Sequence, residues 1–257
     1  MTTPEESFSD LNGKIVTITG GSRGLGKEMA LAFARCGAHV VIASRKKKNC
    51  ELLAADITQN IGVEALAVQC HVGEWDQCNE LFNTVLDRFG RCDVLINNAG
   101  MSPLYESLPD VSQDLFDKVL NVNLRGPFRL SALFGEQMAH DGGGSIINIS
   151  SVAAAEPTPY EIPYGAAKAG LNSLTKSFAR AYAPKVRVNC IMAGPFLTDI
   201  SDAWSEATHK SLKSLPLERG GQPNEIVGAA LYFASDISSF TTGAVLKIDG
   251  GLIASPS

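Results

Sequence analysis

The sequence predicts an α/β protein: a single-domain, doubly wound fold in which a seven-stranded parallel sheet is flanked by helices. Two observations support this prediction. Short β-branched runs alternate with longer helical stretches along almost the whole chain, and such alternation is typical of right-handed strand–helix–strand crossovers. Most of the runs are apolar throughout rather than alternating with polar residues, as expected of parallel strands that are covered on both faces.

The individual elements follow from this periodicity. The apolar, β-branched runs predict strands at Lys14–Thr19, His39–Ala43, Ala65–Cys70, Val94–Ile96, Ser145–Ile149, Val186–Ile191 and Ala244–Ile248. Apolar residues spaced by three and four predict helices between them. These are Leu25–Arg35, Cys50–Gln59, Trp75–Phe89, Gln113–Met138, Tyr164–Tyr182 and Asn224–Ala234.

The chain of 257 residues falls within the range of one large domain. No linker, repeat or low-complexity tract divides it. We expect a short N-terminal arm at residues 1–12 and a catalytic domain at 13–257. Residues 196–216 break the strand–helix rhythm after the sixth strand, and insertions at the carboxyl end of a sheet often form substrate lids. A surface excursion without a role in recognition is the alternative for this segment.

Composition excludes several classes of partner. Hydrophobic residues make up 45% of the chain and the net charge is −5, which gives no reason to expect nucleic-acid binding. No apolar run is long enough to span a bilayer, and the acidic, polar N-terminus does not resemble a secretory signal. Six cysteines and four histidines are scattered without metal-ligand or disulfide-framework spacing. We therefore expect a cytoplasmic protein that binds no membrane and no metal.

A glycine-rich turn follows the first predicted strand and opens the first predicted helix. It reads Thr19-Gly20-Gly21-Ser22-Arg23-Gly24-Leu25-Gly26. Glycines allow the backbone to approach a pyrophosphate closely, and the helix that follows presents unpaired N–H groups to it. The position of the turn between strand and helix predicts a dinucleotide site.

The end of the second strand indicates which dinucleotide binds. A protein specific for NAD usually places a carboxylate there for the ribose hydroxyls, but this strand ends in Ser44 and Arg45, followed by three lysines. A guanidinium matches the geometry of a phosphate, so Ser44 and Arg45 favour a ribose 2′-phosphate, with Arg23 facing it from the glycine turn. NADP(H) is therefore preferred over NAD(H). For the three lysines, a solvated start of the next helix is the better interpretation.

Tyr164 and Lys168 are four residues apart in a helical stretch and therefore share one helix face. A cation beside a phenol lowers the phenol pKa from about 10, which allows proton exchange nearer neutral pH. The spacing is common by chance, so it does not predict catalysis by itself.

Taken together, these motifs resemble the short-chain dehydrogenase/reductase family across nearly the whole chain. The matching elements, in the order and at spacings typical of the family, are Thr19–Gly26, Asn97–Gly100, Asn121–Leu124, Ile149–Ser151, Tyr164 with Lys168, and Ala193–Pro195. The resemblance implies a Rossmann fold and a catalytic tetrad. It makes Tyr164 the proton donor or acceptor, with Ser151 hydrogen-bonded to the substrate oxygen. Ser150 could take this role by sequence alone, but the family spacing favours Ser151. Lys168 would hold the nicotinamide ribose and keep the pKa of Tyr164 low, and Asn123 would interrupt its helix and bind a water.

The remaining matches imply contacts with the dinucleotide. Together with the residues named above, the implied cofactor-binding set is Gly20, Ser22, Arg23, Gly24, Leu25, Gly26, Ser44, Arg45, His71, Val72, Asn97, Ala99, Gly100, Tyr164, Lys168, Pro195 and Thr198. The family usually has an aspartate where this chain has His71, so the side-chain contact at that position is in doubt. Asn98 is expected to stabilise the sheet instead.

The resemblance implies an NADP(H)-dependent oxidoreductase that transfers hydride between nicotinamide and a carbonyl or secondary alcohol. Within the family, reduction of 3-oxoacyl groups on an acyl carrier protein is an alternative, as are polyol, steroid and xenobiotic substrates. A dinucleotide-binding sensor without catalytic activity is a rival from another class. The family also leads us to expect a homotetramer or homodimer, built on the helices near Gln113 and Tyr164 and on the C-terminal strand.

Overall fold

The computed structural model describes residues 8–199, 201, 204 and 206–253. Most of the predicted N-terminal arm, residues 1–7, lies outside the described residues. Its remainder packs onto the domain: Ser9–Leu11 form a turn of 3-10 helix, and Leu11 is fully buried in the core. The backbone N–H of Asp236 donates to the Asp10 carboxylate over 2.8 Å. The packed domain therefore begins several residues before the expected boundary at residue 13.

The predicted seven-stranded parallel sheet is confirmed. Its strands are β1 (Ile15–Thr19), β2 (His39–Ser44), β3 (Ala65–Gln69), β4 (Val94–Asn97), β5 (Gly144–Ser151), β6 (Val186–Ala193) and β7 (Val245–Ile248). They lie in the order β3-β2-β1-β4-β5-β6-β7, and every neighbouring pair is parallel. The order reverses between β1 and β4, and in open α/β sheets ligands bind beside the carboxyl ends of the strands at such a reversal.

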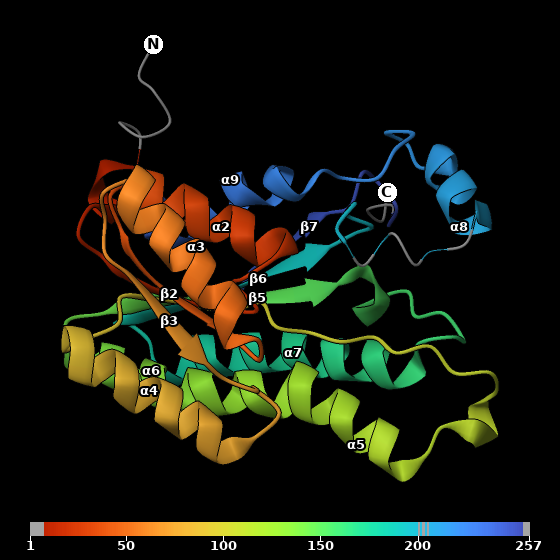
Figure 1. The fold of residues 1–257 in the computed structure, drawn as a ribbon. Helices are drawn as coiled ribbons and strands as arrows, with labels where there is room; N and C mark the ends of the chain where they lie inside the picture. Colours follow the sequence, from red (N-terminus) through yellow and green to blue (C-terminus); the bar gives the residue numbers. More distant parts are fainter. Residues whose placement is uncertain (1–7, 200, 202–203, 205, 254–257) are drawn as a thin grey trace.

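Helices cover both faces of the sheet (Figure 1). One layer contains α2 (Gly24–Arg35), α3 (Lys47–Asn60) and α9 (Val227–Ala234). The other contains α4 (Trp75–Phe89), α5 (Gln113–Leu120), α6 (Gly126–His140) and α7 (Ile162–Ala181). Two buried apolar clusters fill the space between the layers and the sheet, one around Phe33 and Phe233 and the other around Phe134 and Phe178. Both helical layers therefore pack on the sheet through continuous apolar contacts.

The continuous helix predicted for Gln113–Met138 is wrong in one respect. The structure divides it into α5 and α6 by a π-helical segment, Asn121–Arg125. The cause lies in Asn123, whose fully buried amide donates to the backbone carbonyls of Val119 and Met101 over 2.9 and 2.8 Å. A side chain that competes for backbone groups distorts a helix in this way, and the break agrees with the interruption that the family resemblance implied.

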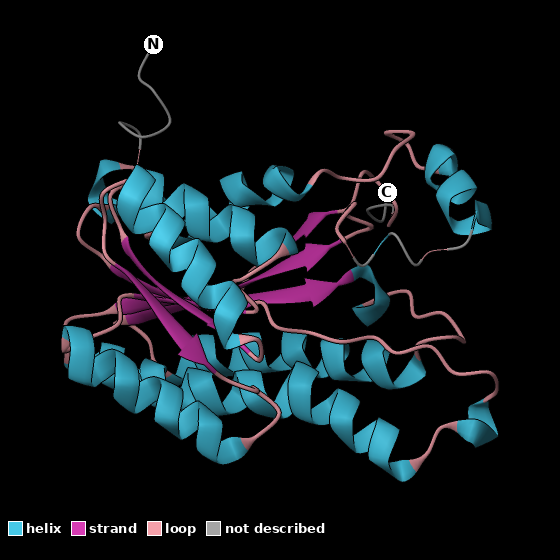
Figure 2. Ribbon diagram, viewed as in Figure 1, coloured by secondary structure: helices cyan, strands magenta, loops and turns pink. Residues whose placement is uncertain are grey.

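The segment after β6 extends beyond the carboxyl end of the sheet, where α8 (Glu206–Ser211) stands apart from both helical layers (Figures 1 and 2). Its first residue, Phe196, is only 6% exposed and packs in the core, with a β-bridge to Gly221. Leu212 and Leu215 are also buried. Residues 200, 202, 203 and 205 of the predicted lid lie outside the described residues, and its role as a lid stays a prediction.

Two further observations concern the described residues. None of their helices is both long and apolar enough to cross a membrane. All six cysteines are buried, and none of them takes part in a disulfide bond among the described residues.

Candidate active site

Three elements bring the predicted tetrad together at the carboxyl edge of the sheet. Ser151 is the last residue of β5, Asn123 lies in the π-helical segment, and Tyr164 and Lys168 are one turn apart on α7. Asn123 and Lys168 approach each other beside Gly100, just past β4. A methyl group placed there would lie 3.0 Å from Oδ1 of Asn123 and 3.6 Å from Nζ of Lys168.

The structure distinguishes the two adjacent serines. Ser150 points into the interior: it is 2% exposed, and its hydroxyl donates to the carbonyl oxygen of Lys168 over 3.3 Å. Ser151 faces the other way, as successive strand residues do. Its hydroxyl accepts from the N–H of Ala153 over 3.2 Å and also hydrogen-bonds Tyr164. Ser151 is therefore the serine that shares the site with the phenol.

Tyr164 does not have the low pKa that the tyrosine–lysine spacing led us to expect. Burial raises the pKa of its phenol to about 12, opposed by the hydrogen bond from Ser151 and reinforced by the nearby carboxylate of Glu161. Lys168 lies with its Nζ 5.6 Å from the centre of the Tyr164 ring. Desolvation of the phenolate is the largest cause of the raised Tyr164 pKa, and the Lys168 ammonium does not offset it. The neutral phenol is the stable form at neutral pH.

Lys168 is itself strongly perturbed. It is 3% exposed, and burial lowers the pKa of its ammonium to about 8. Its Nζ donates to the carbonyl oxygen of Ile149 over 2.8 Å, which fixes the ammonium beneath the end of β5. A lysine held at this pKa is close to half-charged in mildly basic solution, which weakens it further as a source of positive charge for Tyr164.

Asn123 links the π-helical segment to the loop after β4. Its Oδ1 accepts from the N–H of Met101 over 3.2 Å, and its Nδ2 donates to the carbonyl of the same residue. The amide thus holds this loop in place beside Lys168 and Gly100.

The glycine turn after β1 has the shape of a phosphate-binding loop. Gly20 and Gly24 have φ angles of +63° and +51°, a region that favours glycine. A methyl group at Gly26 would overlap the carbonyl oxygen of Gly20 and lie 2.6 Å from Nδ2 of Asn98. Asn98 in turn donates to the carbonyls of Thr19 and Gly20 over 2.9 and 3.1 Å. The turn and the N-terminus of α2 therefore form a rigid cradle that suits a pyrophosphate.

A hydrogen bond ties this cradle to the end of β2. The Ser22 hydroxyl donates to the Ser44 hydroxyl over 2.9 Å. Arg23 and Arg45 directly follow these two serines in the chain, so each is anchored beside the same point. Both arginines are exposed, and no carboxylate ends β2. This arrangement fits a dinucleotide that carries a phosphate on its ribose.

The predicted cofactor residues after β4 differ in whether their side chains are buried. Ala99 and Gly100 follow β4 beside the cradle, where the N–H of Ala99 donates to the Thr19 hydroxyl over 3.1 Å. The side chain of Asn97 is instead buried, with its Nδ2 donating to Ser131 and Asn148. Any contact of Asn97 with a cofactor would therefore be made by its backbone.

The loop after β3 and the segment after β6 complete the predicted set. Nδ1 of His71 accepts a hydrogen bond from the N–H of Gly73 over 3.1 Å, within the loop itself. The neighbouring Val72 is 7% exposed. The carbonyl of Pro195 accepts from Gly221 over 3.0 Å. A methyl group at Gly24 would lie 3.4 Å from Cγ2 of Thr198, which places Thr198 against the phosphate loop.

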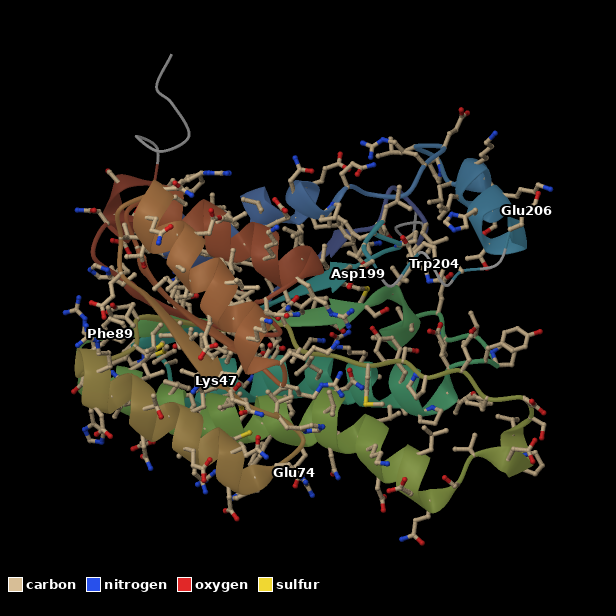
Figure 3. The ribbon with its side chains drawn as sticks, in the orientation of Figure 1. Lys47, Glu74, Phe89, Asp199, Trp204 and Glu206 are labelled. Atoms are coloured by element: carbon tan, nitrogen blue, oxygen red, sulfur yellow. The ribbon has the colours of Figure 1, made fainter. Side chains whose placement is uncertain are left out.

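Two acidic residues near the site were missed by the sequence analysis. Glu161 lies one turn before Tyr164, half-buried, and the pKa of its carboxyl is raised by burial. Asp199 accepts from Arg23 although the two are far apart in the sequence. Its label in Figure 3 lies beyond the carboxyl ends of the strands, close to Trp204. The only available signal was charge: each acidic residue stands beside a motif residue already singled out.

A small hollow lies behind the ring of Tyr164. It is lined by Pro103, Tyr105, Leu115, Val119, Glu161 and Pro163. The Tyr105 hydroxyl donates to the carbonyl of Pro159 and accepts from the N–H of Ile162, each over 2.9 Å. It thereby ties the loop after β4 to the start of α7. Within the described part of the chain, no group of three or more His, Cys, Asp or Glu side chains could hold a metal ion.

A parallel sheet with a phosphate cradle and a tyrosine–lysine pair at its carboxyl edge defines the class of dinucleotide-binding oxidoreductases. Comparison with known proteins narrows the class. A family model described as enoyl-(acyl carrier protein) reductase matches residues 20–253. The chain belongs to the short-chain dehydrogenase/reductase family.

Individual relatives cover nearly the whole chain. It is 36% identical over 245 residues to dehydrogenase/reductase SDR family member 4 of Bos taurus, covering 94% of this chain and 88% of the relative. It is also 36% identical over 245 residues to a 3-oxoacyl-acyl-carrier-protein reductase of Thermotoga maritima, covering 95% and 99%. The crystal structure of an NADPH-dependent 3-quinuclidinone reductase from Rhodotorula rubra aligns with a TM-score of 0.91 at 32% identity, covering 99% of this chain and 97% of that one.

Proposed function

We propose that the protein is an NADP(H)-dependent oxidoreductase that transfers a hydride between nicotinamide and the carbonyl or secondary alcohol group of a small molecule. The observation that supports the reaction is the meeting of Ser151, Tyr164 and Lys168 at the carboxyl edge of the sheet. The observation that supports the cofactor is the Ser22–Ser44 hydrogen bond, which anchors Arg23 and Arg45 beside one point. We further propose that the enzyme acts in the cytoplasm as a homotetramer or homodimer.

The nicotinamide of the cofactor would supply or accept the hydride. The residues of the chain would carry out the proton transfer. Because the pKa of Tyr164 is raised to about 12, the phenol is protonated at neutral pH and is ready to donate to an alkoxide, which is a stronger base than a phenolate. Ser151 hydrogen-bonds the same oxygen and stabilises the charge that develops on it. Lys168 would bind the nicotinamide ribose, and its positive charge would stabilise the phenolate after transfer.

Carbonyl reduction suits these groups better than alcohol oxidation at neutral pH. Oxidation needs a deprotonated Tyr164, and a pKa of about 12 leaves little phenolate until a bound cofactor adds positive charge nearby. The direction in the cell also follows the redox state of the nucleotide pool.

A 3-oxoacyl thioester on an acyl carrier protein is the second candidate substrate. The observation in its favour is the relative from Thermotoga maritima, whose name states that activity and whose length is matched almost completely. An acidic carrier protein would need basic residues around the site. Free small-molecule carbonyls are the first proposal, and the carrier-bound substrate is the alternative.

The test compares wild-type protein with Tyr164→Phe on a panel of ketones, aldehydes and an acetoacetyl thioester. We expect wild type to oxidise NADPH faster than NADH with at least one carbonyl, measured by the loss of nicotinamide absorbance. Tyr164→Phe should lower kcat by roughly 10²- to 10⁴-fold because the proton donor is gone. It should still bind NADPH, measured by fluorescence titration.

Two outcomes would contradict the proposal. Full activity in Tyr164→Phe would exclude this tyrosine as the proton donor. Tight NADPH binding without turnover of any carbonyl by the wild type would instead favour the nucleotide sensor.

A further inference from the structure

An ion pair joins the phosphate loop to the segment after β6. Nη1 of Arg23 lies 2.5 Å from Oδ2 of Asp199. The contact is not isolated, because a methyl group at Gly24 would lie 3.4 Å from Thr198 and 3.8 Å from Oδ1 of Asp199. The start of α2 and the segment after β6 are therefore in contact through these residues.

Arg23 is also one of the two arginines assigned to the cofactor. It is the N-cap residue of α2, and its neighbour Ser22 is hydrogen-bonded to Ser44 beside Arg45. A guanidinium binds carboxylate and phosphate oxygens through the same planar set of N–H donors. A carboxylate that occupies those donors leaves fewer for a phosphate, so Arg23 has two anions that compete for it.

We propose that Asp199 sets the affinity for the phosphorylated cofactor by competing with the ribose 2′-phosphate of NADP(H) for Arg23. This inference rests on the proposed NADP(H) site. In the ligand-free protein Asp199 holds the guanidinium; on binding, the 2′-phosphate replaces the carboxylate. NADH has no 2′-phosphate and leaves the ion pair intact. Asp199 is therefore a specificity-determining residue that lowers the affinity for NADPH relative to that for NADH.

The surroundings of the pair explain why the exchange is reversible. The side chain of Arg23 is 56% exposed and that of Asp199 is 47% exposed, so water screens their attraction and the pair is weak. A phosphate carries more charge and more acceptor oxygens than a carboxylate, and Arg45 adds a second cation for it. The 2′-phosphate therefore displaces the carboxylate from Arg23. The binding free energy of NADP(H) is reduced by the free energy needed to break the ion pair.

The test is a double-mutant cycle on cofactor binding, with Asp199→Asn, Arg23→Gln and both together. Dissociation constants for NADPH and NADH are measured by fluorescence titration of the full-length protein. Asp199→Asn should tighten NADPH binding by about two- to fivefold, the size expected for an exposed ion pair, and should leave NADH unchanged. In the Arg23→Gln background, Asp199→Asn should have no effect on NADPH.

A matched control separates the exchange from a general loss of negative charge. Glu64→Gln also removes one carboxylate from a partly exposed ion pair, with Arg88. Arg88 precedes Phe89 at the end of α4, which lies at the opposite end of the sheet from Asp199 (Figure 3). This variant should bind both cofactors as the wild type does.

Three results would overturn the inference. They are unchanged or weaker NADPH binding in Asp199→Asn, equal tightening of NADPH and NADH, and tightening that persists without Arg23. Failure of the proposed function looks different: wild type would bind NADPH no better than NADH, or would bind it without turning over a carbonyl. Because the readout is binding, the absence of turnover does not affect the cycle.

Discussion

At the scale of single residues, burial controls the chemistry of the candidate site more than the pairing of charges does. Lys168 is buried, and its Nζ donates to the neutral carbonyl of Ile149; among the described residues, no carboxylate forms an ion pair with it. Burying an uncompensated ammonium is costly, and the cost appears as its lowered pKa.

This cost predicts a pH dependence of stability. The pKa of Lys168 is about 8 in the folded protein against an ordinary value of 10.5, so between these values the unfolded chain binds more protons. The free energy of unfolding then rises with pH across this window. Relative to Lys168→Met, which cannot titrate, wild type should gain about 2 to 3 kcal/mol between pH 8 and pH 10.5.

Urea denaturation of both proteins at several pH values checks this. The comparison with Lys168→Met cancels the other groups that titrate in the same range. Parallel curves for the two proteins would show that Lys168 is not desolvated as the structure indicates.

The sequence predicted the positions of the candidate site residues in the fold better than it predicted their pKa values. The spacing of Tyr164 and Lys168 correctly predicted one shared helix face, because spacing along a helix is local information. The direction of the Tyr164 pKa shift was wrong, because burial depends on the whole fold. Asp199 was missed for the same reason, since its contact with Arg23 joins segments at opposite ends of the chain.

At the scale of elements, close backbone approach determines where glycine is required. Gly26 in α2 faces the carbonyl of Gly20 and the amide of Asn98, which leaves no room for a methyl group. Gly228 in α9 has nothing within 4 Å of the same position. The two glycines lie in helices of the same layer, so they form a matched pair for substitution.

We expect opposite effects from alanine at these two positions. Gly26→Ala should lower the free energy of unfolding by about 1 to 3 kcal/mol because of the overlap and should weaken NADPH binding by distorting the cradle. Gly228→Ala should raise the free energy of unfolding by about 0.5 to 1 kcal/mol because alanine loses less entropy in a helix. Chemical denaturation and cofactor titration measure both, and equal responses would contradict the cradle geometry.

The elements themselves were predicted well where their apolar pattern was continuous. All seven strands lie where the β-branched runs indicated, with ends that differ by a few residues. The break at Asn121–Arg125 could not be derived from periodicity, because the apolar pattern continues through it. It depends on the Asn123 amide reaching the loop after β4, a contact that only the assembled fold provides.

At the scale of the whole molecule, exposed apolar residues gather where the chain was expected to associate. β7 lies at the edge of the sheet, the position at which a strand of another chain can be added. Phe240 is fully exposed just before this strand, and Leu246 within it is 38% exposed. Apolar exposure of this kind marks an interface between proteins, which supports the proposal of a homo-oligomer that uses the C-terminal strand.

The proposed homo-oligomer predicts a specific response to surface substitution. Sedimentation of the wild type at micromolar concentration should give the mass of a tetramer or a dimer. Phe240→Ser together with Leu246→Glu should reduce that mass to a smaller species, because burying an unpaired charge at the β7 edge is unfavourable. Leu52→Glu, at a residue of α3 that is 62% exposed, should leave the mass unchanged because this helix is not part of the expected interface. A monomeric wild type, or a loss of mass in Leu52→Glu alone, would contradict association through the C-terminal strand.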